Sequence, residues 1–376
     1  MKLAVLKETD AGERRVAASP ETVKRFAGWD AEISIEAGAG APSGMPDADF
    51  EAAGATIAPS RAAAVGGADI ILAVRAPDPA SLSGAEAGAI LAAILNPFQA
   101  GDTLSGYANA GLTAMAMDFM PRITRAQSMD VLSSQANLAG YRAVLDAAHE
   151  YGRGFPMMMT AAGTVSAAKL FVMGVGVAGL QAIATGRRLG AQVSATDVRA
   201  ATREQIESLG AKAIFVKDVE GIEGEGTGGY ASEMSEEYKA AQAKLVSDHI
   251  ARQDIVITTA LIPGRPAPRL ISDAQLASMK PGSVIVDLAA PQGGNVEGCV
   301  PGETVRKHGV TLMAPTNINA SLAEVSSQLY ARNLWNFLSA FWDGDAKSLV
   351  WPDDDDIVRG VTVVKDGKVS NERLNA

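Results

Sequence analysis

The chain has 376 residues, of which 47% are hydrophobic and 20% charged, so it is long enough for two globular domains and too apolar to be disordered throughout. Its formal net charge of −10, with no basic stripe, excludes nucleic acid as a partner. One cysteine, Cys299, and three histidines argue against a disulfide framework and against a metal site, so we expect no metal.

The amino terminus meets charge at Lys2, unlike a signal peptide, and no apolar run approaches the roughly 18 residues that span a bilayer. We therefore expect a cytoplasmic or organelle-internal protein that reaches a membrane only through a partner.

Short apolar runs alternate with helical patterns over the first 120 residues. A helix is predicted to begin at Ser19-Pro20, where a capping residue precedes a proline in the first turn, and another near 47–53. Strands are predicted at 2–6, 32–36, 69–74, 89–95 and 112–117. This alternation indicates βαβ units and a mainly parallel sheet.

A long helix over 127–151 is expected to bridge two domains, because its only interior break is Gly140. A second series follows, with helices at 179–189, 202–209 and 236–252. Its six strands, in a Rossmann-like order, are predicted at 169–173, 192–196, 213–215, 254–258, 283–287 and 311–313.

The carboxyl-terminal part is predicted to return to the first domain through a helix over 323–341 and to end in a hairpin around Asp366-Gly367. The expected fold is α/β, with two Rossmann-like domains of mainly parallel sheets, joined by long helices, with a cleft between them. The first domain comprises 1–126 plus about 320–376, the bridging helix 127–150, and the second domain 151–319.

A dinucleotide motif stands at the start of the second domain. Gly174, Gly176 and Gly179 have the GxGxxG spacing between an apolar strand and a helix, which suits a pyrophosphate at the helix N-terminus. Asp197 ends the next strand, where a carboxylate accepts hydrogen bonds from the adenine ribose and repels a 2′-phosphate. The motif therefore predicts NAD, although the nearby Arg199 could accommodate that phosphate.

Two further segments each allow two interpretations. The glycine-rich stretch 221–229, followed by Tyr230, is either a lid over a cofactor or a surface linker. In the polar segment 121–135, Gln127, Asp130 and Ser134 could share one face of a helix and bind a cofactor, with Asp130 and Ser133 on a neighbouring face. The segment could equally be the capped, solvated first turn of that helix.

With these segments in view, nearly the whole chain resembles the NAD(H)-binding domain of the transhydrogenase branch of the alanine dehydrogenase/transhydrogenase family. The most specific stretches are 121–130 (PRITRAQSMD), 137–143 (NLAGYRA), 174–181 (GVGVAGLQ), 228–231 (GGYA), 258–268 (TTALIPGRPAP) and 281–289 (PGSVIVDLA).

The resemblance implies that NAD(H) lies between the two domains. It places Arg122, Gln127, Asp130 and Ser133 around the nicotinamide, with Gln127 between the two nicotinamides. It also implies that Val175, Gly176 and Val177 cover the pyrophosphate, that Asp197 and Arg199 hold the adenosine end, and that Gly229 and Tyr230 form a closing lid. Further cofactor contacts are implied at Ile123, Thr124, Val198, Gln242 and Leu261.

Two departures separate the chain from alanine dehydrogenase. That enzyme has a substrate-binding lysine after the third strand and a histidine after the next, where this chain has Arg75 and the segment 94–97 (ILNP). Without the histidine there is no evident acid–base group for the amination of pyruvate. Arg15 matches the shared pattern, and Arg75 could replace the lysine as a carboxylate anchor.

The resemblance therefore implies direct hydride transfer between NAD(H) on this chain and NADP(H) on a partner domain, coupled to proton translocation by a membrane subunit. It also suggests a homodimer attached peripherally to the inner membrane through its partners. The alternatives are an amino-acid dehydrogenase of the alanine type and a non-catalytic NAD-binding redox module.

Overall fold

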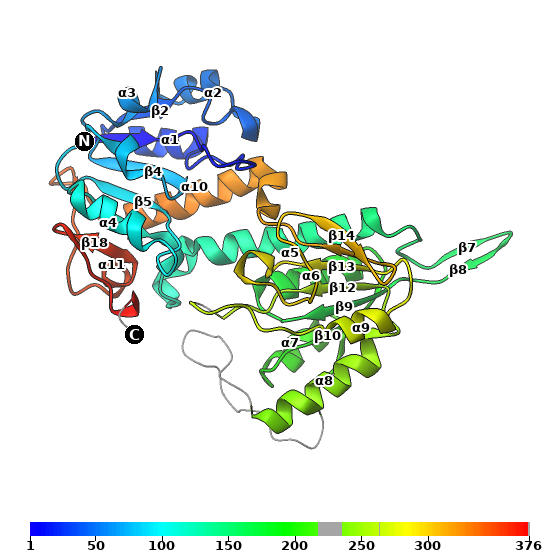
Figure 1. Ribbon diagram of the computed structural model, residues 1–376. Coiled ribbons are helices and arrows are strands. Elements are labelled where there is room, and N and C mark those ends of the chain that lie inside the picture. The colour runs from blue at the N-terminus through cyan, green and yellow to red at the C-terminus, as the bar shows by residue number, and fades with distance from the viewer. Residues whose placement is uncertain (217–234, 263, 375–376) are drawn as a thin grey trace. The chain divides into compact units, whose positions relative to one another are not determined.

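The computed structural model describes residues 1–216, 235–262 and 264–374. The chain divides into two compact units, the first made of Met1–Gln135 with Asn319–Ala376 and the second of Ala136–Ile318. Each unit is built on its own mainly parallel sheet with helices packed on it (Figure 1). The predicted α/β fold with two Rossmann-like sheets is confirmed.

The first unit holds an eight-stranded sheet in the order β19-β18-β6-β5-β4-β1-β2-β3. All of its strands are parallel except β18, which is antiparallel to β6, and β19, which is antiparallel to β18. The strands are β1 (Lys2–Val5), β2 (Glu32–Glu36), β3 (Thr56–Ala58), β4 (Ile70–Arg75), β5 (Ile90–Ile94), β6 (Thr113–Ala116), β18 (Thr362–Lys365) and β19 (Lys368–Val369). The chain runs outward from β1 in both directions, so the switch of strand order lies between β1 and β4.

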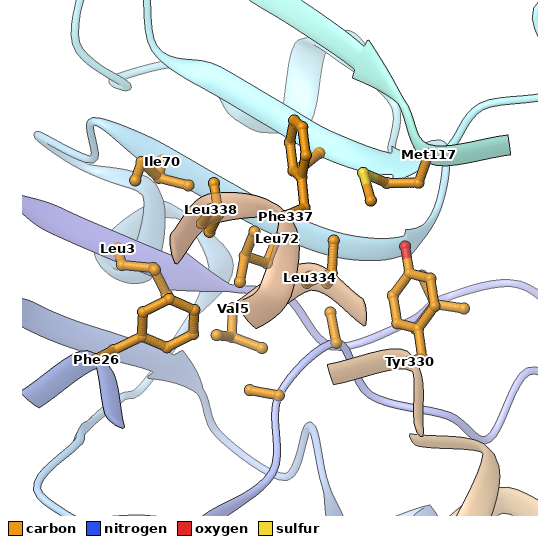
Figure 2. Close-up of a cluster of buried hydrophobic side chains, with 14 of the residues drawn as sticks. Leu3, Val5, Phe26, Ile70, Leu72, Met117, Tyr330, Leu334, Phe337 and Leu338 are labelled. Carbon is orange, nitrogen blue, oxygen red and sulfur yellow. The ribbon is translucent and has the colours of Figure 1, made fainter. Parts of the chain in front are cut away.

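Successive residues of β1 face opposite sides of this sheet, as a strand requires. Leu3 and Val5 belong to one buried cluster and Ala4 to the other. Helix α10 (Ala323–Ser339) covers the first face, and Figure 2 shows Leu334 and Phe337 among the strand side chains. The carboxyl-terminal segment thus completes the core of the first unit.

Five further helices pack in the first unit. Ser19 caps α1 as predicted, because its hydroxyl accepts a hydrogen bond from the backbone N–H of Thr22 at 3.3 Å. The helices are α1 (Pro20–Ala27), α2 (Asp47–Ala52), α3 (Arg61–Val65), α4 (Gly101–Asn109) and α11 (Asp356–Val361).

The second unit holds a seven-stranded sheet in the order β11-β10-β9-β12-β13-β15-β14. The first six are parallel in the predicted Rossmann order, and β14 is an antiparallel edge strand that was not predicted. The strands are β9 (Lys169–Met173), β10 (Gln192–Thr196), β11 (Lys212–Ala213), β12 (Ile255–Thr258), β13 (Val284–Asp287), β14 (Thr304–Lys307) and β15 (Val310–Met313).

The helices of the second unit are α6 (Val177–Arg188), α7 (Thr202–Ser208), α8 (Glu236–Ile250) and α9 (Asp273–Ser278). A separate hairpin of β7 (Met158–Thr160) and β8 (Gly163–Val165) extends away from the sheet of this unit (Figure 1). No helix in the part of the chain that the structure describes is both long and apolar enough to cross a bilayer.

Two predicted elements differ from the structure. The long helix, α5 (Val131–Glu150), begins at 131 instead of 127, because a short 3-10 helix over Thr124–Met129 precedes it. The third strand of the second unit is Lys212–Ala213 instead of 213–215. The predicted terminal hairpin is confirmed, with Asp366 and Gly367 both at positive φ, as a type I′ turn requires.

Candidate functional site

In the second unit, the turn between β9 and α6 is a preformed phosphate-binding geometry. Gly174 has φ of +96°, and a Cβ there would lie 2.8 Å from the hydroxyl of Thr259. A Cβ on Gly179 would lie 2.0 Å from the carbonyl oxygen of Gly174, so only glycine lets the helix approach the strand. A Cβ on Gly176 would meet nothing within 4 Å, which leaves space in front of the helix N-terminus.

Asp197 lies beside this turn, directly after β10, and is 8% exposed. One carboxylate oxygen accepts a hydrogen bond from the backbone N–H of Val175 at 2.7 Å. The guanidinium of Arg199 forms an ion pair with the same carboxylate at 2.9 Å and donates to the carbonyl of Val175 at 3.1 Å. The structure therefore brings together the glycine turn and both residues that the motif assigned to the adenosine end.

The loop after β12 is held against the glycine turn. The hydroxyl of Thr259 donates to the carbonyl of Gly174 at 2.9 Å, and the side chain of Asn295 bonds both the N–H and the carbonyl of Ala260, at 3.0 and 2.9 Å. Asp287, which is fully buried, accepts from the backbone N–H of Asn295 at 2.8 Å. Burial raises the pKa of Asp287, and its hydrogen bonds oppose that shift. No pattern in the sequence predicted this support.

Helix α5 meets the start of α6 within the second unit. A Cβ on Gly140 would lie 2.0 Å from the carbonyl of Ala178, and the amide of Asn137 donates to Gln181 at 3.3 Å. The apparent break at Gly140 is therefore a close helix contact. The similarity of stretch 137–143 was the only sequence signal for it.

The other cofactor positions implied for this unit are scattered around the same sheet. Val177 is exposed at the first position of α6, Val198 is half-buried beside Asp197, Gln242 lies on α8, and Leu261 is half-buried in the loop that follows β12. Gly229 and Tyr230, and with them the predicted lid, lie outside the described residues.

In the first unit, the polar segment forms the 3-10 helix Thr124–Met129 and the junction with α5. Arg122, Ile123, Thr124 and Gln127 are exposed, whereas Ala126 and Met129 are buried as anchors. The predicted shared helix face of Gln127, Asp130 and Ser134 is wrong, because Gln127 lies in the 3-10 helix and Asp130 lies between the two helices.

Asp130 and Ser133 are paired at the beginning of α5. The two carboxylate oxygens of Asp130 accept from the backbone N–H of Ser133 at 2.9 Å and from its hydroxyl at 2.6 Å. This is an N-terminal helix cap, as the second interpretation of the segment expected. It also fixes the carboxylate and the hydroxyl in one orientation, so the cap and a binding role are compatible.

A buried ion cluster lies at the carboxyl ends of β1 and β4. Glu13 pairs with Arg15 at 2.6 Å and with Arg75 at 3.0 Å. Burial raises the pKa of Glu13, but the hydrogen bond and charge of Arg15, together with the charge of Arg75, outweigh it and lower the pKa to about 2. The nearby Glu8 lines a pocket with Lys7. Burial raises the pKa of Glu8 to about 7.

Two family models match consecutive parts of the chain. The alanine dehydrogenase/PNT N-terminal domain matches residues 4–139, and the alanine dehydrogenase/PNT C-terminal domain matches residues 143–372. The chain belongs to the alanine dehydrogenase/PNT family. The resemblance inferred from the motifs is thereby confirmed.

Within this alanine dehydrogenase/PNT family, the chain is similar to members of both branches. It is 50% identical to the first of the polypeptides that make up the NAD(P) transhydrogenase alpha subunit of Rhodospirillum rubrum, over 100% of this chain and 99% of that protein. A solved transhydrogenase structure from Sinorhizobium meliloti is 51% identical, with a TM-score of 0.89, over 98% of this chain and 100% of that one. Alanine dehydrogenase of Halomonas elongata is 30% identical, over 98% of this chain and 95% of that protein.

Proposed function

We propose that this chain is the NAD(H)-binding component of an NAD(P) transhydrogenase, which exchanges hydride between its own NAD(H) and NADP(H) on a partner domain. The observation that carries the proposal is the glycine turn of the second unit with the buried carboxylate of Asp197 beside it. The choice of branch is supported by 50% identity to a transhydrogenase subunit against 30% to an alanine dehydrogenase.

The residues present fit NAD(H). The open space at Gly176 lets a pyrophosphate approach the N-terminus of α6, where unpaired backbone N–H groups favour an anion. Asp197 can accept hydrogen bonds from ribose hydroxyls, and its charge opposes a 2′-phosphate. We further propose that Val175, Val177, Val198, Arg199, Gln242, Leu261, Gly229 and Tyr230 contact the same cofactor.

Bound NAD(H) supplies or accepts the hydride at its nicotinamide ring. The chain's task is then to bind, orient and exclude water, and no covalent nucleophile is needed. We propose that Arg122, Gln127 and the Asp130–Ser133 pair act at the nicotinamide end, with Ile123 and Thr124 beside them. The orientation imposed by the 2.6 Å bond from Ser133 to Asp130 supports this role, because a fixed donor–acceptor set can hold a carboxamide in one pose.

The ion cluster disfavours the alanine dehydrogenase reaction. Arg75, the candidate carboxylate anchor, already donates to Glu13, and so does Arg15. A 2-oxo acid would therefore have to displace a buried internal carboxylate. Asp118, Glu8 and Glu13 are carboxylates of this unit, but segment 94–97 supplies no histidine.

The decisive test mixes the purified chain with the NADP(H)-binding component of a transhydrogenase and follows reduction of the 3-acetylpyridine analogue of NAD⁺ by NADH, with NADP⁺ present in catalytic amount. We expect exchange that requires both components. Oxidation of NADH by the chain alone with pyruvate and ammonium would instead establish the alanine type. Tight NADH binding without exchange in either assay would leave the redox-module alternative.

We also propose a homodimer that meets the membrane peripherally, at its cytoplasmic face, through a proton-translocating subunit. The β7–β8 hairpin supports the dimer: among the described residues it pairs with no other strand, and Met157 and Met159 are 65% and 81% exposed. An isolated hairpin with apolar side chains is marginal in water, and a second copy offers the same side chains by two-fold symmetry.

Met159→Glu should convert the dimer to a monomer, as measured by light scattering. Thr164→Glu, in the paired strand, adds the same charge at a polar position and is the matched control. A wild-type chain that is monomeric at micromolar concentration would contradict the dimer.

A further inference from the structure

Helix α10 contacts the polar segment 128–135 through three side chains or carbonyls on one of its faces. They lie at Ser326, Asn333 and Asn336, which are seven and three residues apart, so they fall on neighbouring turns of the same helix face. All of these residues belong to the first unit, as does the segment they contact. The sequence pattern of α10 predicts no role for it beyond completing the fold.

Asn333 makes two hydrogen bonds, one on each side of Asp130 in the sequence. Its amide nitrogen donates to the carbonyl of Ser128 at 2.8 Å, and its amide oxygen accepts from the hydroxyl of Ser134 at 2.7 Å. Asn333 is 7% exposed, so these bonds are shielded from competing water. One side chain therefore spans the junction between the 3-10 helix and α5.

Two neighbouring contacts reinforce this junction. Asn336 donates to the same carbonyl of Ser128 at 3.0 Å, and the amide of Gln135 donates to the carbonyl of Ser326 at 3.1 Å. The 3-10 helix has no side-chain cap of its own. Its end is therefore set by α10, and with it the direction in which Gln127 and Asp130 are presented.

We propose that Asn333 is a positioning residue for hydride transfer, which acts by holding the Ser128 carbonyl and the Ser134 hydroxyl so that Gln127, Asp130 and Ser133 keep one arrangement. This inference rests on the proposed function, because it assigns that segment to the nicotinamide end. Displacement of reacting groups by about 1 Å can lower a rate by two orders of magnitude, so a small shift of the junction is sufficient.

The test compares three variants on α10. Asn333→Ala removes both bonds, and Asn336→Ala removes the second donor from a half-buried site that tolerates truncation. Gln328→Ala is the control, since the amide of Gln328 donates within α10 itself, to Glu324 at 3.4 Å. Three quantities are measured: kcat of hydride exchange with the partner component, Kd for NADH of the chain alone, and amide hydrogen exchange of the peptide covering 128–135.

For Asn333→Ala we expect kcat to fall about tenfold or more, Kd for NADH to change less than about threefold, and amide exchange in 128–135 to rise about tenfold. Asn336→Ala should shift the same quantities less, and Gln328→Ala should shift none. If Asn333→Ala does not fold, Asn336→Ala decides by the same criteria.

Unchanged kcat with raised amide exchange would overturn the positioning role, and so would an equal loss in all three variants. Absence of hydride exchange by the wild-type chain would instead remove the proposed function. In that case amide exchange still decides whether Asn333 fixes the segment: no change in 128–135 would overturn the inference.

Discussion

The glycines of the turn after β9 differ in what a methyl group would meet. A Cβ on Gly176 meets nothing within 4 Å, whereas one on Gly179 would overlap the carbonyl of Gly174. Gly176→Ala should therefore leave the free energy of unfolding nearly unchanged and weaken NADH binding, because the methyl group occupies the approach of the pyrophosphate. Gly179→Ala should lower both. Urea unfolding and calorimetric titration with NADH measure the two effects, and equal unfolding curves for both variants would contradict the assignment.

Asp197 is expected to set the preference for NADH over NADPH. Asp197→Asn keeps an acceptor for the N–H of Val175, which lies 2.7 Å away, but removes the negative charge and loosens Arg199. We expect NADH affinity to fall about tenfold, as the loss of a charged hydrogen bond does elsewhere, and the gap to NADPH to narrow. Asp197→Ala should narrow it too.

The control for this change is the double variant Asp197→Asn/Arg199→Ala. It should lose the gain in NADPH affinity, because the guanidinium that would bind the 2′-phosphate is gone. Separate calorimetric titrations with the two nucleotides give both values. A preference for NADH that survives in Asp197→Asn would show that other residues exclude the phosphate.

At the scale of elements, the contact of α5 with α6 depends on one glycine. A methyl group on Gly140 would lie 2.0 Å from the carbonyl of Ala178, so Gly140→Ala should separate the two helices and lower the free energy of unfolding by about 1–3 kcal/mol. Gly101→Ala is the matched control at the start of α4, where a Cβ meets nothing. It should be neutral or slightly stabilising. Similar urea midpoints for the two variants would contradict this contact.

Elements with a strong local signal were predictable. The alternation of Leu3, Ala4 and Val5 and the GxGxxG turn with its flanking strand and helix are local patterns, and the structure confirms them. The edge strand β14 was missed, because its residues are mostly exposed and lack an apolar alternation. The start of α5 was misplaced, because the apolar spacing of 124–130 suits a 3-10 helix as well as an α-helix.

The candidate site shows the same division. Asp197 could be predicted because the motif fixes its distance along the chain from the glycines. The support from Asn295 and Asn333 could not, because each acts across 35 or more positions of sequence on a backbone group. Such contacts leave no periodic pattern in either segment. Only the three-dimensional arrangement of each unit shows them.

For the whole molecule, two carboxyl groups of the first unit respond to pH in opposite directions. The pKa of Glu8 is raised by burial from 4.5 to about 7, so its contribution to stability is full below pH 4.5 and is lost as the pH rises through 7. The pKa of Glu13 is lowered to about 2, chiefly by Arg15 acting against burial, so its contribution is full above pH 4.5 and is lost as the pH falls through 2. Together they favour stability near pH 4.5.

Glu8→Gln isolates the first of these contributions. The amide resembles the protonated carboxyl group in shape and charge, and it can still accept from the backbone N–H of Val74, which lies 2.7 Å from Glu8. A shift of the pKa from 4.5 to about 7 corresponds to about 3 kcal/mol, so the variant should gain up to that amount over the wild type at pH 8. At pH 4.5 the two proteins should be nearly equal. Asp49→Asn, at an exposed position, changes the same charge and should show no such dependence on pH. Urea unfolding at pH 4.5, 6 and 8 measures the difference, and a constant gap between variant and wild type across that range would mean that Glu8 is ionised in the folded chain at neutral pH without cost.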